Sequence, residues 1–112
     1  MKYLDAIDQN PKQFFTLIGE KSQRISFFIF YMPSQQSWYF NLSYGDVTIN
    51  GAQLTVGPNI LRGYRRNINF GLACLSTDGL DPFYLNDFVT GRIKLILLNE
   101  TDVDLVEAEF DS

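Results

Sequence analysis

Three carboxylates crowd one glycine-containing loop, and they are the residues whose type and spacing come nearest to a reactive site. Asp78, Asp81 and Asp87 surround Gly79. Hard cations such as Ca²⁺ prefer several carboxylate oxygens, and paired carboxylates can carry acid–base catalysis. The spacing does not fit an EF-hand loop, and the glutamate that closes such a loop is missing. We therefore expect these aspartates to cap turns, and we expect neither a metal site nor a catalytic site.

Other reactive groups are scarce. The chain has no histidine and a single cysteine, Cys74. Triads that use imidazole as the base are therefore excluded, as are the usual zinc sites and an intrachain disulfide. Cys74 lies in the apolar run of residues 70–75, which is typical of an inert core thiol. No phosphate-binding glycine motif occurs, so we expect no cofactor and no enzymatic activity.

Charge is distributed unevenly and suggests a contact between protein chains. Residues 100–112 hold six of the thirteen acids and none of the nine bases, while the basic cluster lies at residues 62–66. The net charge of −4 and the shortness of that cluster argue against nucleic-acid binding. Arginine and aromatic residues are enriched at protein interfaces. The candidate interface therefore comprises Arg62, Tyr64, Arg65, Arg66, Asp102, Asp104, Glu107, Glu109 and Phe110, with the hypothesis that one subunit's tail meets another's arginine loop.

The elements that must position these residues are mostly strands. The chain of 112 residues is 46% hydrophobic, and we expect one β domain over residues 1–112, with a core in about 2–98 and an acidic segment in 99–112. Short β-rich runs recur between Gly, Pro, Asn and Asp clusters, which predicts an all-β fold, a small sandwich or partly open barrel of about seven or eight mostly antiparallel strands. The strands are expected at residues 3–7, 13–18, 24–32, 38–44, 47–49, 53–56, 70–76 and 92–98.

Three local patterns sharpen this prediction. Phe28 and Phe30 make the second face of the 24–32 strand apolar, so we expect both of its faces to be covered. Asn50-Gly51 is a strong hairpin signal between residues 47–49 and 53–56. Asp81 can cap a helix over residues 82–88, the one short helix expected. The tail after residue 98 alternates apolar and acidic residues, which favours a further strand or a segment that orders only on a neighbouring chain.

The order of several motifs resembles the baseplate plug protein family of contractile-tailed bacteriophages. The resemblance spans roughly residues 9–98, and the tail extends the usual ending. It implies a sandwich-like virion protein of the tail baseplate, bound to hub, tube or spike components and without catalysis. The motifs are Pro11-Lys12-Gln13-Phe14-Phe15, Trp38-Tyr39-Phe40-Asn41-Leu42, Gly57-Pro58-Asn59-Ile60-Leu61, Asn69-Phe70-Gly71-Leu72 and Asp78-Gly79-Leu80-Asp81-Pro82.

We therefore expect a structural component that binds other phage tail proteins, and also copies of itself, in virion assembly. Neither a membrane-spanning segment nor a signal peptide is expected, so synthesis in the host cytoplasm follows. Two other classes remain open: a small ligand-binding β-barrel and, with less support, a carboxylate-based enzyme. The bulky inward-facing Phe, Ile and Leu residues argue for a filled interior over a ligand cavity, and no small-molecule substrate is expected.

Overall fold

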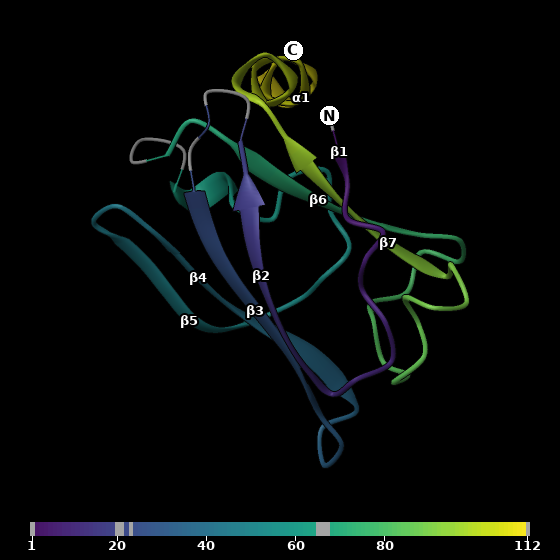
Figure 1. Ribbon diagram of the computed structural model, residues 1–112. Coiled ribbons are helices and arrows are strands. Elements are labelled where there is room, and N and C mark those ends of the chain that lie inside the picture. Colours follow the sequence, from purple (N-terminus) through teal and green to yellow (C-terminus); the bar gives the residue numbers. More distant parts are fainter. Residues whose placement is uncertain (1, 20–21, 23, 65–67, 112) are drawn as a thin grey trace.

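Two antiparallel sheets packed face to face form the body of the protein (Figure 1). This computed structural model describes residues 2–19, 22, 24–64 and 68–111, with the backbone alone for residues 109–111. Within that part of the chain there are seven strands, which confirms the all-β, sandwich-like prediction. The strands are β1 (Lys2–Tyr3), β2 (Lys12–Ile18), β3 (Arg24–Met32), β4 (Ser37–Tyr44), β5 (Val47–Gln53), β6 (Gly71–Ser76) and β7 (Ile93–Leu98).

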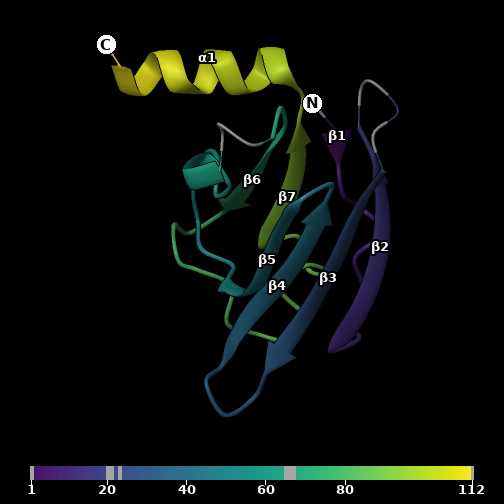
Figure 2. The same cartoon turned by 90° about the vertical axis from the view of Figure 1, so that its left-hand side faces the viewer.

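The larger sheet is a meander in which β2, β3, β4 and β5 lie side by side in chain order. The smaller sheet has the order β1-β7-β6, so it joins the first strand to the last two. A long connection from β5 to β6 carries the chain from one sheet to the other and includes the 3-10 helix η1 (Arg62–Tyr64). Figure 2 shows the four-stranded sheet nearly face-on, with β6 and β7 behind it.

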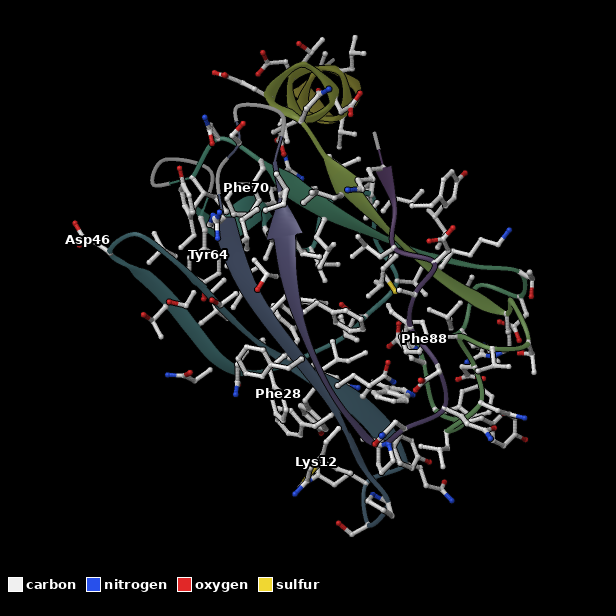
Figure 3. The ribbon with its side chains drawn as sticks, in the orientation of Figure 1. Lys12, Phe28, Asp46, Tyr64, Phe70 and Phe88 are labelled. Atoms are coloured by element: carbon white, nitrogen blue, oxygen red, sulfur yellow. The ribbon has the colours of Figure 1, made fainter. Side chains whose placement is uncertain are left out.

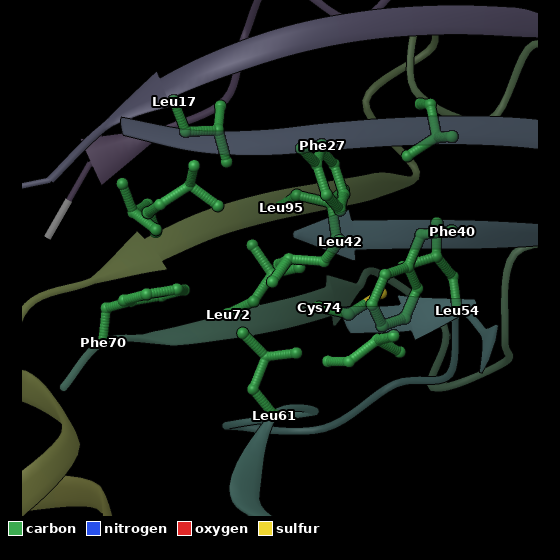
Figure 4. Packing of buried hydrophobic residues seen from close by; sticks show 14 of the residues in the cluster. Leu17, Phe27, Phe40, Leu42, Leu54, Leu61, Phe70, Leu72, Cys74 and Leu95 are labelled. Atoms are coloured by element: carbon green, nitrogen blue, oxygen red, sulfur yellow. The ribbon is translucent and has the colours of Figure 1, made fainter. Parts of the chain in front are cut away.

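Alternation along each strand builds one core between the sheets. Trp38, Phe40 and Leu42 of β4 point inward and are at most 2% exposed, as their spacing predicts. The inward residues of β6 and β7 meet them from the other side (Figure 4). Cys74 lies in this core with no exposed surface, and its burial, followed by the charge of Asp81, raises its pKa to about 12. Side chains fill the interior, which is the arrangement expected of a structural sandwich.

The predicted hairpin at Asn50-Gly51 is wrong. Both residues belong to the single strand β5, and residues 54–56 form no strand. Gly51 adopts a φ of 65°, and the pairing between β4 and β5 shifts register there, between Phe40 and Leu42. The Gly51 N–H donates a hydrogen bond of 2.6 Å to Asn41 Oδ1 on the neighbouring strand. The positive φ that Asn-Gly favours therefore forms a bulge within a strand, because the turn at Gly45-Asp46 already reverses the chain.

The helix predicted over residues 82–88 is also wrong, and so is the prediction for the tail. Residues 82–91 form bends and hydrogen-bonded turns, and Asp81 accepts a hydrogen bond from the Val56 N–H instead of capping a helix. The tail forms helix α1 (Glu100–Asp111), neither a strand nor an unordered segment. Asn99 Oδ1 accepts from the Asp102 N–H, and Asp102 Oδ2 accepts from the Asn99 N–H, which is a capping box.

A tight contact between a glycine and a buried amide fixes the start of β6. A Cβ added to Gly71 would lie 2.7 Å from Asn59 Oδ1. That oxygen accepts hydrogen bonds from the Leu61 and Leu72 N–H groups, and Asn59 is only 7% exposed. The amide therefore cannot move aside without breaking both bonds, so the Phe70-Gly71-Leu72 motif requires glycine at its centre.

We predict that Gly71→Ala lowers the free energy of unfolding by about 1–3 kcal/mol, because the added methyl overlaps the buried amide. Urea denaturation of the wild type and the variant measures this loss. Gly63→Ala is the matched control, since a Cβ at Gly63 meets nothing within 4 Å, and its unfolding free energy should stay close to that of the wild type. Equal stability of the two variants would contradict the role assigned to the Asn59 contact.

Candidate interaction surface

Residues 77–92 form a loop whose ends meet, since the Thr77 N–H donates to the Arg92 carbonyl at 3.0 Å. The loop, hereafter the 77–92 loop, leads from β6 to β7 and lies beside the start of β7 in Figure 1. Compact loops with joined ends and their own internal packing are frequently functional. Its three aspartates are the ones singled out above for possible chemistry.

Asp87 is the centre of the loop. It is only 1% exposed, and its two oxygens accept hydrogen bonds of 2.9 and 2.6 Å from Arg92 Nε and Nη2. Asp87 Oδ2 also accepts from the Phe83 and Tyr84 N–H groups at 2.7 and 2.8 Å. A buried carboxylate is stable only with such partners. Burial opposes ionisation, but the hydrogen bonds from Arg92 and the two backbone groups outweigh it and hold the pKa of Asp87 below its usual value.

Arg92 ties the remainder of the loop to this centre. Its Nη1 donates to Asp78 Oδ1 at 2.8 Å and to the Leu80 carbonyl, and its Nη2 donates to the Asp81 carbonyl. The guanidinium carbon lies 4.2 Å from the centre of the Phe83 ring. The contact with Asp87 and the other acids raises the pKa of Arg92, so this side chain stays charged throughout the ordinary pH range. One arginine thus connects both halves of the loop.

Core side chains anchor the loop from the inside. Trp38 Nε1 donates to the Tyr84 carbonyl at 3.0 Å, and the Tyr31 hydroxyl donates to the Phe83 carbonyl at 2.7 Å. The Trp38 ring packs edge-on against Phe88, with 5.2 Å between ring centres. Buried Trp and Tyr side chains commonly use their polar atoms in this way. The loop is therefore a rigid part of the fold, continuous with the core.

The rigid loop nevertheless exposes apolar side chains, which we call the loop patch. Its members come from one short segment, and each is between 38% and 58% exposed: Leu80, Tyr84, Leu85 and Val89. Exposed apolar groups that cluster in this way mark sites of protein contact more often than scattered ones do. Because the backbone beneath them is fixed, binding a partner would cost little ordering of the chain.

The three loop aspartates have structural partners. Asp78 accepts from the Ser76 hydroxyl, the Leu80 N–H and Arg92, and the Ser76 bond is the main cause that lowers its pKa. Asp81 binds the Val56 N–H, which ties the loop to the segment after β5. Among the described residues, no group of three His, Cys, Asp or Glu side chains is placed to hold a metal ion. The aspartates act here as hydrogen-bond acceptors that shape the loop.

The structure places the predicted interface residues in two groups. Arg62 and Tyr64 form η1, whereas Arg65 and Arg66 lie outside the described residues. The acidic members all lie on α1: Asp102, Asp104, Glu107 and Glu109, together with Phe110.

Arg62 Nε contacts Glu107 Oε2 at 3.0 Å within the same chain, and Glu107 is 3% exposed. The arginine loop and the tail thus meet, although within one subunit, and their role as a partner interface stays a prediction. Asp104 is exposed, and Tyr64 is 39% exposed.

Sequence reasoning missed the contribution of the 77–92 loop to such a surface. The sequence predicts that Asp87 shapes a turn, but it does not predict the buried pair that Asp87 forms with Arg92. The signal for its structural role was Arg92, five residues later, together with the absence of any other base in the loop. The apolar residues at 80, 84, 85 and 89 follow no periodicity that separates exposed side chains from buried ones. Their exposure is therefore not predictable from the sequence pattern.

A comparison with protein families finds a match to the family described as Cyanophage baseplate Pam3 plug gp18, over residues 1–100. The chain belongs to this family. The match confirms the resemblance drawn from the sequence motifs, and it identifies the chain as a structural protein of a phage tail baseplate. The 77–92 loop lies inside the matched residues, while nearly all of α1 lies beyond them.

A search among curated proteins finds no match to the chain. Within the described residues, no helix is both long and apolar enough to cross a membrane.

We predict that Asp87→Asn lowers the free energy of unfolding by about 3 kcal/mol at pH 7, because it leaves Arg92 without its buried carboxylate. The folded pKa of Asp87 is depressed, so its contribution is complete above the ordinary pKa of about 4 and is lost as the pH falls through the folded value. The stabilities of wild type and variant should therefore converge as the pH falls below about 4. Denaturant titrations over this range provide the measurement.

Asp78→Asn is the control for this prediction. Asp78 also binds Arg92, but its side chain is 43% exposed, so solvent screens the contact and its removal should change stability much less. A gap in stability between Asp87→Asn and wild type that does not narrow as the pH falls below about 4 would contradict the assignment of the pH dependence to Asp87.

Proposed function

We propose that this chain acts as a baseplate plug by binding neighbouring tail proteins of the virion, and that the loop patch is the surface through which it does so. The observation that carries the proposal is the combination of exposure and rigidity. Leu80, Tyr84 and Val89 are each more than half exposed, yet the Asp87–Arg92 pair and Trp38 fix the backbone that presents them.

Family membership supports the same reading. The matched family is named for a plug in a phage baseplate, and its match includes the whole 77–92 loop. A plug must stay in place between other subunits, which requires contact surfaces and does not require catalysis of a reaction. The hub, tube or spike components of the tail are the partners that we propose, with residues 1–112 acting as one β domain without catalytic activity.

The chemistry of the loop patch fits an apolar site on such a partner. Its side chains are aliphatic or aromatic, and the buried carboxylate behind them, that of Asp87, is paired with Arg92. Asp87 and Arg92 satisfy each other, so a partner needs no buried counter-charge to cover this surface. Hydrophobic anchors of this kind dominate binding energy when a pocket encloses them.

We predict that replacing Tyr84 and Val89 by Ser weakens binding of the chain to its tail partner at least about tenfold, because each loss removes apolar contact area. Co-expression with each hub, tube and spike protein of the same phage, followed by co-purification and titration, measures the effect. The side chains are exposed, so thermal unfolding of the variant should match that of the wild type.

Leu75→Ser is the matched control, since Leu75 on β6 is 44% exposed and lies outside the loop. Binding should persist in this variant. Asp87→Asn supplies a second readout: it retains every side chain of the loop patch but loosens the loop, so it should weaken binding as well. Unchanged binding by the Tyr84 and Val89 double variant would remove the loop patch from the proposed role.

A further inference from the structure

The outer face of the four-stranded sheet carries a row of aromatic rings that no described element covers. Phe14 on β2 is 71% exposed, and Phe28, Phe30 and Tyr39 continue the row across β3 and β4. Successive ring centres lie 5.5, 5.5 and 5.8 Å apart. The prediction that both faces of β3 are covered is therefore wrong for the described chain: Phe28 and Phe30 are only half-buried, and they rest on each other. We call this surface the aromatic face.

A shallow groove of about 370 Å³ lies beside the row. Phe14 and Phe28 form part of its lining, and Asn41 and Thr48 contribute polar groups from β4 and β5. The groove therefore offers apolar surface together with a few hydrogen-bonding side chains. This mixture is typical of protein contact surfaces.

The aromatic face is also basic. Lys12 and Arg24 lie on it, and neither forms an ion pair with another described residue. Figure 3 shows Lys12 and Phe28 on the same side of the sheet, whereas Asp46 lies at the far tip of the β4–β5 turn. The outward positions of these strands include no acid; they are Lys12, Phe14, Thr16, Ile18, Arg24, Ser26, Phe28, Phe30, Met32, Ser37, Tyr39, Asn41, Ser43, Thr48, Asn50 and Gln53.

Helix α1 is acidic, which complements the basic aromatic face, and it lies on the other side of the sandwich. It packs through Val103 against Ala73, Ile96 and Leu98, on the outer face of the smaller sheet. The helix holds six acids and no base. Four of its exposed residues share one face at helical spacing: Thr101, Asp104, Leu105 and Ala108, of which Leu105 is 64% exposed.

We propose that α1 of one copy docks on the aromatic face of a second copy of this chain. The exposed Asp104 then approaches a basic residue of the aromatic face, Lys12 or Arg24, and Leu105 reaches the exposed rings. A single chain cannot make this contact with itself, because the two surfaces lie on opposite sides of the sandwich. Face-to-face pairing of two aromatic faces would offer Lys12 and Arg24 no opposite charge, since the outward positions of these strands include no acid.

The resulting contact joins different surfaces of the two copies, so it repeats from copy to copy and gives a ring or a chain. The inference goes beyond the proposed function, because it uses neither the loop patch nor another tail protein. The loop patch remains free for a different partner in such an assembly.

Sedimentation velocity of the full chain over a range of concentrations tests the contact. We expect association at 50 mM salt that weakens at least about tenfold at 500 mM, because salt screens the charges. Phe14→Ser, Arg24→Glu and Asp104→Lys should each weaken it about tenfold at low salt. The double variant Arg24→Glu with Asp104→Lys should recover part of the loss, since the reversed charges attract again.

Two controls separate this contact from other effects. Asp5→Lys makes the same change in net charge as Asp104→Lys at an exposed residue outside α1, and it should leave association unchanged. Leu80→Ser alters the loop patch and should also leave association unchanged. Loss of association in the Leu80 variant would overturn the assignment to the aromatic face.

A mixing experiment gives the sharpest result. Phe14→Ser keeps a working α1, and Asp104→Lys keeps a working aromatic face, so at a concentration where each variant alone is mostly monomeric the mixture should form a one-to-one dimer. A wild type that stays monomeric at low salt would overturn the proposal. Normal association of Asp104→Lys together with loss in Phe14→Ser would also overturn it, since the aromatic face would then bind something other than α1.

Discussion

The conformation of the 77–92 loop, and of the surface it presents, depends on the burial of the Asp87 carboxylate. An ionised carboxylate with 1% exposure needs strong hydrogen-bond donors around it, and Arg92 and two backbone N–H groups supply them. The same arginine then spans the loop to Asp78 and to two carbonyls. The three aspartates singled out for possible catalysis therefore act as a scaffold, because each of them accepts hydrogen bonds that shape the loop.

Apolar surface is divided by the sheets into a part that stabilises the fold and a part that does not. The inward faces of both sheets meet in one core built around Trp38 and Phe27, which are fully buried. Within the described part of the chain, the outward rings Phe14, Phe28 and Phe30 pack against one another and against Tyr39 on the same face. Because burial from water is the main source of stability, these outer rings contribute little to the isolated chain. The contact proposed with α1 of a second copy would cover them.

The sequence predicts the alternating strands well and the irregular segments poorly, for physical reasons that particular residues show. Strands with one buried face, such as residues 38–44, reveal themselves by period-two alternation. Asn50-Gly51 encodes a positive φ, but that requirement is met equally by a hairpin or by a bulge, and only the neighbouring turn at Gly45 decides between them.

The tail shows the opposite case, in which the sequence carries a local helix signal beside a misleading alternation of apolar and acidic residues. Asn99 and Asp102 are spaced as a capping box, and Val103, Val106 and Glu107 share the buried side of the helix that follows. Glu107 interrupts the apolar pattern of the buried side because it is charged. Its burial is not predictable from the local sequence, because its partner Arg62 lies far away in the chain. The family match reaches only residue 100, so the relation to plug proteins supports the sandwich and the 77–92 loop but does not bear on α1. A contact made through α1 rests on charge and geometry alone, and it can therefore fail without weakening the role assigned to the matched part of the chain.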